Sequence, residues 1–323
     1  MTSERAQSVV ALGGGHGLHA SLTALRRLVD DLVVDDLTAI VTVADNGGSS
    51  GRLRGEFGVL PPGDLRMALA ALCGDDDWGR TWSDVLQHRF AGDGEMRGHV
   101  VGNLLIVSLW EQLGDHVQAL EWVGRLLGAT GRVLPMALSP LDITADVRGL
   151  DPDDPEALTS VRGQVEVATT SGVIQAIHLD PPEPVPCPQA VTAVREADWV
   201  VLGPGSWFTS VIPHLMVPEL RAALVQTDAR VILVLNLDEQ AGETQGFGPE
   251  DHLAALAEHA PDLKVHTVLA DRGSIGVEAD ELAGLVAAYG AELVLDDVAL
   301  GDGTPRHDPV RLAEAYARIL QRG

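Results

Sequence analysis

Residues 7–20 have the sequence QSVVALGGGHGLHA, in which a short apolar run ends in a cluster of glycines. An amphipathic segment over residues 18–32 follows directly. A buried strand that ends in a glycine-rich turn and leads into a helix is typical of the first unit of a parallel α/β sheet. The turn also contains the pattern GxGxxA, beginning at Gly15, and Asp45 follows the next predicted strand. These two features leave an NAD-dependent oxidoreductase open as one alternative, although a single match of this kind is weak evidence.

Apolar runs and helical patterns alternate along the rest of the chain. A second strand is expected at residues 37–44, and later strands within ADWVVLGPG, RVILVLNL, KVHTVLA and AELVLDD. Residues 132–180 change to period two and predict a β-rich excursion, which includes VRGQVEVATT and an acidic loop, DPDDPE. Strand–helix alternation on both sides of the excursion predicts one α/β domain over residues 1–323, with a Rossmann-like parallel sheet covered by helices on both faces.

The composition argues against several classes of protein. The formal net charge is −25, so a nucleic-acid partner is not expected. Lys264 is the only lysine and has no Walker A context, which makes P-loop and pyridoxal-phosphate chemistry improbable. Cys73 and Cys187 lack metal-ligand spacing and are expected to be reduced thiols in the cytoplasm. No apolar run reaches the roughly 20 residues of a membrane span, and the first residues lack the pattern of a secretory signal.

Four glycine-rich segments follow predicted strands: GGGHGLHA, VADNGGSSGRLRG, GPGSWFTS and LDEQAGETQGF. Ligands of parallel sheets bind beyond the carboxyl ends of the strands, so these loops are expected at one ligand-binding edge. Backbone amides and helix N-termini at that edge would suit a diphosphate without any lysine.

Several single residues keep two interpretations. Asp64 is placed to cap a helix or to bind a metal, and Ser206 to cap a helix or to bind an anion. The run DDD at residues 75–77 is expected to be a solvated helix end, and His99 and His178 are expected to be structural histidines.

Seven strings, in this order, resemble the gluconeogenesis-factor (YvcK-like) family, a branch of the CofD-like fold: GGGHGL, LTAIVTVADNGGSSGRLR, LPPGDLR, GHVVGNLL, GRVLP, GPGSWFTSVIPHLMVPEL and GETQGF. The resemblance runs from about Val9 to about His252 and returns at the C-terminal RHDP. It implies a Rossmann-like fold that binds a UDP-sugar, such as UDP-N-acetylglucosamine or UDP-glucose. It also implies a cytoplasmic regulator that affects carbon metabolism, cell-wall synthesis and cell shape, without established catalysis. The alternative is an Mg²⁺-dependent transferase like the 2-phospho-L-lactate transferases of the other branch, which act in deazaflavin cofactor biosynthesis.

The resemblance also implies a set of ligand-binding residues. In sequence order they are Gly13, Gly14, Gly15, Gly17, Asp45, Asn46, Gly48, Ser49, Ser50, Arg52, Asn103, Gly203, Gly205, Ser206, Tyr289 and Arg306. Asp45 is also the candidate for holding Mg²⁺ or a ribose hydroxyl. The chain departs from the family pattern at His16, where threonine is usual, at Phe247, where tyrosine is common, and in a shorter segment before Arg306. A homodimer and an unidentified protein partner are further expectations.

Overall fold

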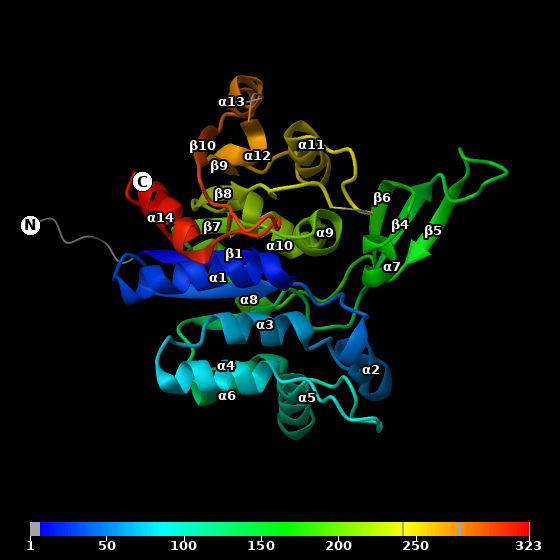
Figure 1. Cartoon of the computed structure of the whole chain (residues 1–323), viewed down its shortest axis with the longest axis vertical. Helices are drawn as coiled ribbons and strands as arrows, with labels where there is room; N and C mark the ends of the chain where they lie inside the picture. The colour runs from blue at the N-terminus through cyan, green and yellow to red at the C-terminus, as the bar shows by residue number, and fades with distance from the viewer. Residues whose placement is uncertain (1–6, 241, 277–278, 323) are drawn as a thin grey trace, which may run out of the picture.

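The computed structural model describes residues 7–240, 242–276 and 279–322. Its centre is a seven-stranded sheet in the order β10-β9-β8-β7-β1-β2-β3, in which every neighbouring pair is parallel (Figure 1). The strands are β1 (Ser8–Gly13), β2 (Asp36–Val41), β3 (Arg132–Pro135), β7 (Trp199–Leu202), β8 (Arg230–Val234), β9 (Thr267–Asp271) and β10 (Glu292–Asp296). The chain builds outward from β1 in one direction and later from β7 in the other. The point where the order reverses therefore lies between β1 and β7, where parallel sheets bind ligands.

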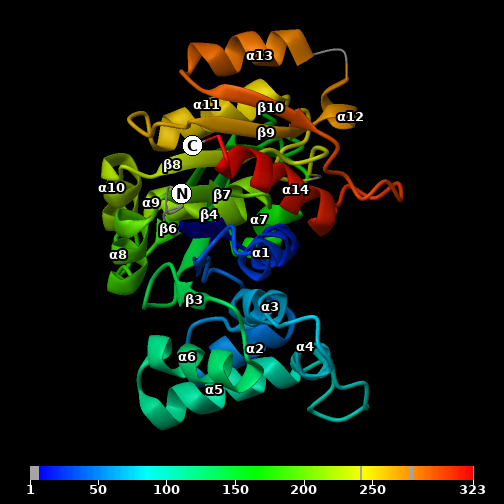
Figure 2. The same ribbon diagram turned by 90° about the vertical axis from the view of Figure 1, so that its left-hand side faces the viewer.

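Helices cover both faces of the sheet, as the sequence predicted (Figure 2). On one face α1 (Gly15–Asp30) contacts α3 (Gly63–Ala71) and α14 (Pro309–Leu320). The other face carries a chain of contacting helices: α8 (Pro188–Glu196), α10 (Pro218–Gln226), α9 (Ile212–Met216), α11 (Pro249–His259) and α13 (Ala279–Ala288). Strands enclosed on both sides lack polar alternation, which is why the predicted strand segments are continuous apolar runs.

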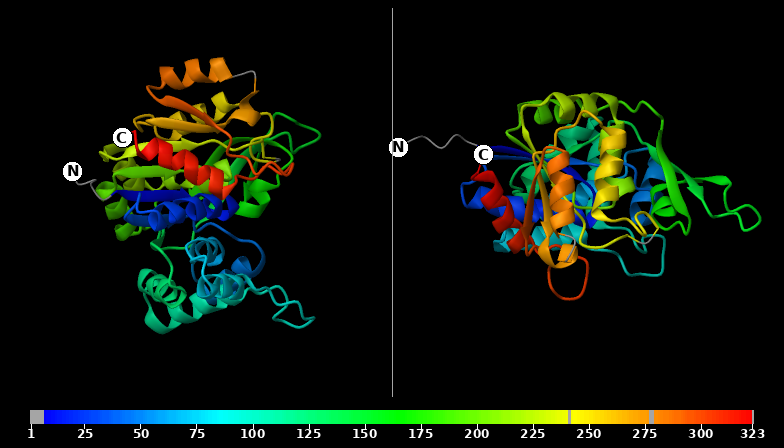
Figure 3. Two further views of the ribbon diagram at one scale, coloured as in Figure 1. Left: turned by 60° about the vertical axis from the view of Figure 1, so that its left-hand side comes forward. Right: turned by 90° about the horizontal axis from the view of Figure 1, so that it is seen from above.

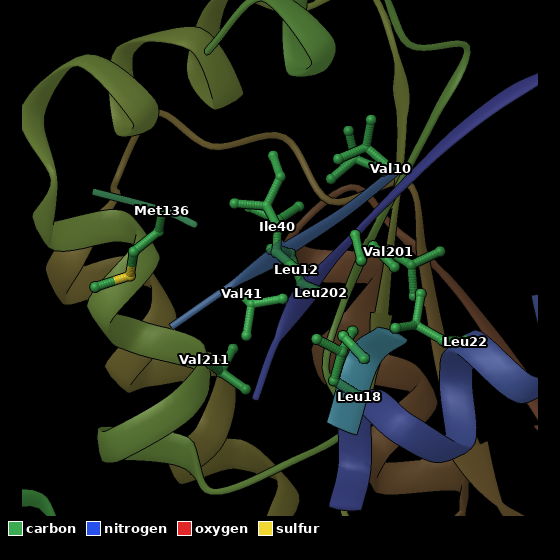
Figure 4. Packing of buried hydrophobic residues seen from close by; sticks show 14 of the residues in the cluster. Val10, Leu12, Leu18, Leu22, Ile40, Val41, Met136, Val201, Leu202 and Val211 are labelled. Carbon is green, nitrogen blue, oxygen red and sulfur yellow. The ribbon is translucent and has the colours of Figure 1, made fainter. Parts of the chain in front are cut away.

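The core forms where α1 packs on the central strands (Figure 4). Leu18 and Leu22 of α1 are buried with Leu12 of β1 and Ile40 of β2. Since burying such a side chain contributes about 1.5–3 kcal/mol, this contact holds the start of α1 firmly against the end of β1.

A further helical layer packs on α3, in the lower part of Figure 1. It consists of α4 (Asp77–Gln87), α5 (Val101–Leu113) and α6 (His116–Leu127), all of which contact α3 and one another. The predicted solvated helix end is found here, because Asp76 caps α4 by accepting a hydrogen bond from the Gly79 amide. The neighbouring Asp75 forms an ion pair with Arg26 of α1, at 2.7 Å.

The β-rich excursion is real but smaller than predicted. Its sheet has three antiparallel strands, β4 (Asp142–Arg148), β5 (Leu158–Arg162) and β6 (Val173–Asp180), and it projects from the main body (Figure 3). Residues 132–135, assigned to the excursion from the sequence, instead form β3 of the main sheet, parallel to β2. Most of VRGQVEVATT is also not a strand, since Gly163 has a φ of 109° and starts the short helix α7 (Gln164–Ala168). That turn ends the alternation, and Val167 is the residue of α7 that becomes buried.

Among the described residues, no helix combines the length and the apolar composition that crossing a bilayer requires.

Candidate functional site

A cavity of about 570 Å³ lies at the carboxyl ends of β1, β7 and β8. Four segments that are distant in sequence form most of its wall: residues 14–17, 204–206, 236–240 and 305–307. Gln164 and Val165 of α7 add a wall from the small sheet. The volume falls within the roughly 300–1,000 Å³ of small-molecule sites.

The first glycine turn brings the start of α1 to this cavity. Gly14 occupies the N-cap position of this 16-residue helix and has no side chain to cap it; the amide of the next residue, Gly15, donates to Asp64. Gly15 has a φ of 57°, and a Cβ there would meet no atom within 4 Å. A Cβ at Gly17 would lie only 2.2 Å from the Pro204 carbonyl oxygen. Gly15 therefore faces open space, and Gly17 is the glycine that lets the two glycine loops approach closely.

The second glycine loop, residues 203–206, is stabilised by polar side chains that follow β8. Asn236 makes two hydrogen bonds with the backbone of Gly205: it accepts from the amide at 3.0 Å and donates to the carbonyl at 2.9 Å. Gln240 accepts from the Trp207 amide at 3.2 Å and donates to the Ser206 hydroxyl at 3.3 Å. Ser206 precedes the π-helical turn η1 (Trp207–Val211), but its side chain does not cap that turn. Its hydroxyl lies on the cavity wall instead.

Glu243 provides a second support for the same loop. Its buried carboxylate accepts hydrogen bonds from the Phe208 amide at 3.0 Å and the Thr209 hydroxyl at 2.5 Å. Burial raises the pKa of this carboxyl group, while the hydrogen bonds lower it. Asn236, Gln240 and Glu243 together therefore stabilise the second glycine loop through hydrogen bonds.

Two carboxyl groups, Asp64 and Asp45, lie close enough for their charges to interact. Asp64 lines the cavity and accepts a hydrogen bond from the Gly15 amide. Burial and the nearby negative charge of Asp45 raise the pKa of Asp64 to about 7. Burial also raises the pKa of Asp45, opposed mainly by its hydrogen bonds with the Gly47 amide, at 2.8 Å, and with Ser50. The sequence offered a cap as one role for Asp64; this is wrong, because Pro62 is the N-cap of α3 and Asp64 points toward the glycine turn.

This donor set fits a magnesium ion that shares its coordination with a ligand. Mg²⁺ in proteins is commonly held by one or two carboxylates, with water and substrate phosphates completing the octahedron. The described part of the chain contains no cluster of three or more His, Cys, Asp or Glu that would hold a metal alone. Asp45 and Asp64 are therefore the two side chains that would hold Mg²⁺ here.

The serines of the loop after β2 stabilise the fold around this site and do not enter the cavity. The Ser49 hydroxyl contacts His99 and accepts from the Val100 amide and the Asn103 side chain, each at 3.2 Å. The Ser50 hydroxyl accepts from the Gly63 amide at 2.9 Å. These bonds join α2 (Gly48–Phe57) to the starts of α5 and α3.

The remaining polar residues of that loop are also bound elsewhere. Asn46 donates to Glu166 at 2.7 Å and accepts from the Val165 amide, which ties the loop to α7. Arg52 donates to the Arg97 carbonyl at 2.8 Å, outside the cavity. Asn103 is buried and accepts from Arg66 at 3.0 Å. These predicted residues therefore connect the loop after β2 to neighbouring segments of the fold, and Gly48 begins α2.

The two C-terminal residues on the predicted ligand list have different positions. Arg306 lies on the cavity wall, directly before α14, which Asp308 caps and Pro309 begins as the sequence predicted. Tyr289 comes after α13 and before β10, hence at the amino ends of the strands, with its side chain 46% exposed. The cavity therefore brings together Gly14, Gly15, Gly17, Gly205, Ser206 and Arg306, with Gly13 and Gly203 at the strand ends behind them, but it does not include Tyr289.

The family model described as 2-phospho-L-lactate transferase CofD matches residues 9–297. The chain belongs to the CofD family. It is 53% identical to the "Putative gluconeogenesis factor" of Mycobacterium tuberculosis over 97% of this chain and 90% of that protein. It is 33% identical to the "Gluconeogenesis factor" of Listeria innocua over 99% and 98% of the two chains, so within the family it belongs with the gluconeogenesis factors.

Solved structures agree with this placement in the CofD family. A crystal structure of a Bacillus halodurans protein, described as a member of the UPF0052 family, superposes with a TM-score of 0.83. The two sequences are 31% identical, and the match covers 97% of this chain and 99% of the other. The resemblance inferred from the seven strings is thereby confirmed.

Two of the three departures from the family pattern are single residues, His16 and Phe247, and only His16 lines the cavity. His16 is exposed on its wall, in the first turn of α1. Phe247 packs edge-on against Phe208 and His252, with ring centroids 5.8 and 5.7 Å apart, and so replaces a tyrosine with an apolar contact under the second loop.

Two cavity-lining residues were missing from the sequence-based expectations. Asn236 and Gln240 line the cavity and hydrogen-bond the second glycine loop. The signal that could have revealed them was their place directly after a strand, in RVILVLNL and LDEQAGETQGF. Asp64, for which the sequence offered a metal-binding role, also lines the cavity. Among the residues expected to be structural, Cys73 and Cys187 are buried free thiols, and His178 contacts Asp146 at 3.1 Å on the small sheet.

Proposed function

We propose that this chain is a nucleotide-sugar-binding regulator of the gluconeogenesis-factor type, and that a UDP-sugar occupies the cavity at the ends of β1 and β7. One observation carries the proposal: two glycine loops and the first turn of α1 line the same cavity. Amides at a helix N-terminus bind phosphate through their hydrogens and through the helix dipole. Such a site needs no lysine, in keeping with a chain whose single lysine, Lys264, is outside the cavity wall.

Arg306 gives the proposed site its positive side chain. Arg306 lies on the cavity wall, although the chain as a whole has a net charge of −25. Its planar group of five donors suits a phosphate or the polar edge of a uracil. UDP-N-acetylglucosamine and UDP-glucose are the ligands we favour, because both combine a diphosphate with hydroxyl-rich ends that the polar wall can hydrogen-bond.

The proposed role is a cytoplasmic one, in which the bound state of the cavity links carbon metabolism to cell-wall synthesis and cell shape. The name of the relatives supports the link to carbon metabolism. The link to the cell wall follows from the proposed ligand, because UDP-N-acetylglucosamine supplies wall sugars.

Isothermal titration with UDP-N-acetylglucosamine, UDP-glucose, GDP and NAD tests the proposal directly. We expect heat of binding from at least one UDP-sugar and none from NAD. Arg306→Ala should weaken the UDP-sugar, whereas Arg195→Ala, an exposed arginine of α8 outside the cavity wall, should bind like the wild type. Binding of NAD alone, or equal binding by both variants and the wild type, would overturn the proposal.

A second function, an Mg²⁺-dependent transferase of the phospholactate type, is favoured by one different observation. Asp64 lines the cavity and Asp45 lies near it, and the matching family model describes such a transferase. When bound, Mg²⁺ supplies positive charge to phosphate oxygens and stabilises a leaving phosphate. In that role Asp45 and Asp64 would hold the ion, and Arg306 would orient the nucleotide.

An assay with phospholactyl-guanosine diphosphate, a deazaflavin acceptor and Mg²⁺ separates the two functions. Product formation by the wild type, lost in Asp64→Asn and accompanied by no UDP-sugar binding, would replace the regulator with the transferase. UDP-sugar binding without product supports the regulator.

A further inference from the structure

A second hollow, of about 580 Å³, lies between β6 of the small sheet and α11, and it shares no wall residue with the cavity of the candidate site. Figure 1 shows β6 on the side of the small sheet that faces α9 and α11. Phe208, Met216 and Phe247 give this hollow an apolar wall. The α11 wall consists of residues spaced three and four apart, which form one face of the helix: Asp251, Ala254, Ala255, Glu258 and His259. We call it the β6–α11 groove.

The wall opposite α11 is the outer edge of β6. Residues 174–178 all line the groove. Successive side chains of a strand point to opposite faces, so a groove that five consecutive residues line follows the edge of the strand, where the backbone groups lie. β6 is the end strand in the order β5-β4-β6. Among the residues that the structure describes, its backbone hydrogen-bonds to the backbone of β4 and of no other segment.

This edge has few of the features that normally prevent an exposed strand from pairing. Proteins protect such edges with prolines, charged side chains, bulges or a covering segment, because a free edge can pair with another strand. Between Val173 and Leu179, β6 contains no proline and, apart from His178, no acidic or basic residue. Its one bulge leaves Gln175 unpaired with β4, while the pairing is regular from Ala176 to Asp180. The edge of β6 is therefore able to accept a further strand.

We propose that the β6–α11 groove binds an extended segment of a partner protein, which adds a fourth strand to the small sheet. The backbone of this segment pairs with the outer edge of β6. Its alternate side chains pack on Phe208, Met216 and Phe247. In this mode of recognition the main-chain hydrogen bonds provide affinity, and the contacts of alternate side chains provide specificity.

The edge itself favours a protein segment over other occupants. It presents a row of N–H and C=O groups at strand spacing, and another extended backbone offers the matching row. A lipid lacks such a row. The net charge of −25 opposes a nucleic acid, whose affinity depends largely on cationic contacts.

Two charged side chains on the walls define the composition of the segment. Arg221 of α10 and Glu258 of α11 are exposed, and in the described part of the chain neither has an ion-pair partner within 4.0 Å. The other carboxylate of the wall, Asp251, already accepts a hydrogen bond from the Gly248 amide at 2.8 Å. A complementary segment therefore has an apolar stretch flanked by one acidic and one basic residue.

Fluorescence polarisation with synthetic heptapeptides measures binding to the full chain. Each probe has the sequence KXTXTXE or EXTXTXK, in which X is Val, Ile, Leu or Phe, so eight probes cover both charge orders. Fluorescein blocks the N-terminus of each probe and an amide blocks its C-terminus. We expect saturable binding of at least one probe. If none of the eight binds at millimolar protein concentration, the proposal is wrong.

Backbone methylation tests whether the probe binds as a strand. Alternate residues of an edge strand direct their N–H groups toward the neighbouring strand and away from it. N-methylation of residues 2, 4 and 6 of the probe should therefore differ in effect from N-methylation of residues 3 and 5. We expect one pattern to weaken binding by about tenfold or more, through lost hydrogen bonds, and the other to keep most of the affinity. Equal effects of the two patterns would contradict pairing with β6.

Substitutions on the walls locate the bound probe. Ala254 is exposed on α11, and Ala254→Arg should abolish binding by filling the groove with a long side chain. Ala287→Arg, at an exposed alanine of α13 outside the groove, is the matched control and should bind like the wild type. The double variant Arg221→Glu with Glu258→Arg should prefer the charge order that the wild type binds less well. Circular dichroism verifies that each variant is folded.

Two further results would overturn the proposal. Probe binding that Ala254→Arg leaves unchanged would place the peptide outside the groove. Self-association of the wild type that Ala254→Arg abolishes, without binding of any probe, would assign the groove to a second copy of the chain.

Discussion

The Asp64 carboxyl group should make the stability of the fold depend on pH. Its pKa is raised from the ordinary 3.8 to about 7, chiefly by burial and then by the adjacent Asp45. The folded chain therefore holds a proton that the unfolded chain releases, so the group costs no stability below about pH 4. The loss of unfolding free energy grows as pH rises. It reaches its full value above about pH 7, because Asp64 is then ionised in the folded state as well. At about 1.4 kcal/mol per pH unit, the full cost is about 4 kcal/mol.

Asp64→Asn removes this cost, because asparagine cannot ionise but its oxygen can still accept from the Gly15 amide. From the two pKa values, wild type should lose about 2.5 kcal/mol relative to the variant between pH 5 and pH 8. Urea unfolding of both proteins at these two pH values measures the difference, and taking the difference cancels every group that titrates alike in both. Asp84→Asn, an exposed aspartate on α4, is the matched control.

A constant difference in unfolding free energy between wild type and Asp64→Asn at the two pH values would refute the reasoning. It would mean that water or a neighbouring group stabilises the charged carboxylate as well as bulk solvent does. If Asp64→Asn were less stable than the wild type at pH 8, the contradiction would be stronger. The ionised carboxylate would then raise the free energy of unfolding instead of lowering it.

Three other substitutions test separate parts of the site. Arg306→Ala should weaken UDP-N-acetylglucosamine by about 1.5–3 kcal/mol, the usual contribution of a charged hydrogen bond, with an unchanged circular dichroism spectrum; equal affinity in calorimetry would place Arg306 among the solvated arginines. Gly17→Ala should lower the melting temperature as well as affinity, because its Cβ would lie 2.2 Å from the Pro204 carbonyl oxygen; a native-like melting curve would show that the two glycine loops can separate at little cost. Asn236→Ala should cost about 1–3 kcal/mol of stability, because it leaves the Gly205 amide and carbonyl without their side-chain partner; urea unfolding that matches the wild type would show that water replaces both bonds.

Local patterns in the sequence were sufficient for most of the fold. The apolar runs that became β1 and β2 lack polar alternation because both faces of a parallel sheet are covered. The sequence predicted the start of α14 from Asp308 and Pro309, because capping depends on residues next to one another in the chain. The glycine turn after β1 likewise predicted the edge of the sheet at which the cavity lies, since the backbone at Gly15 is left-handed and Gly15 lines that cavity.

The sequence was a weaker guide to which polar residues of a glycine-rich loop line the cavity. The side chains of Ser49, Ser50 and Arg52 could each donate a hydrogen bond to a phosphate. In the structure they instead make hydrogen bonds within the protein, with His99, the Gly63 amide and the Arg97 carbonyl respectively. Those partners are contributed by segments 13 to 50 residues away. No local spacing contains that information.

The sequence by itself determined the order of strands and helices, the glycine turns and the family, because each depends on neighbouring residues or on ordered strings of them. Only the tertiary structure decided that Asp64 stands beside Asp45, that Asn236 grips the second glycine loop, and that Tyr289 is at the far edge of the sheet. The physical reason lies in the crossover connections. They set which strand ends meet, and thereby which side chains share a hydrogen bond, a buried charge or a cavity wall.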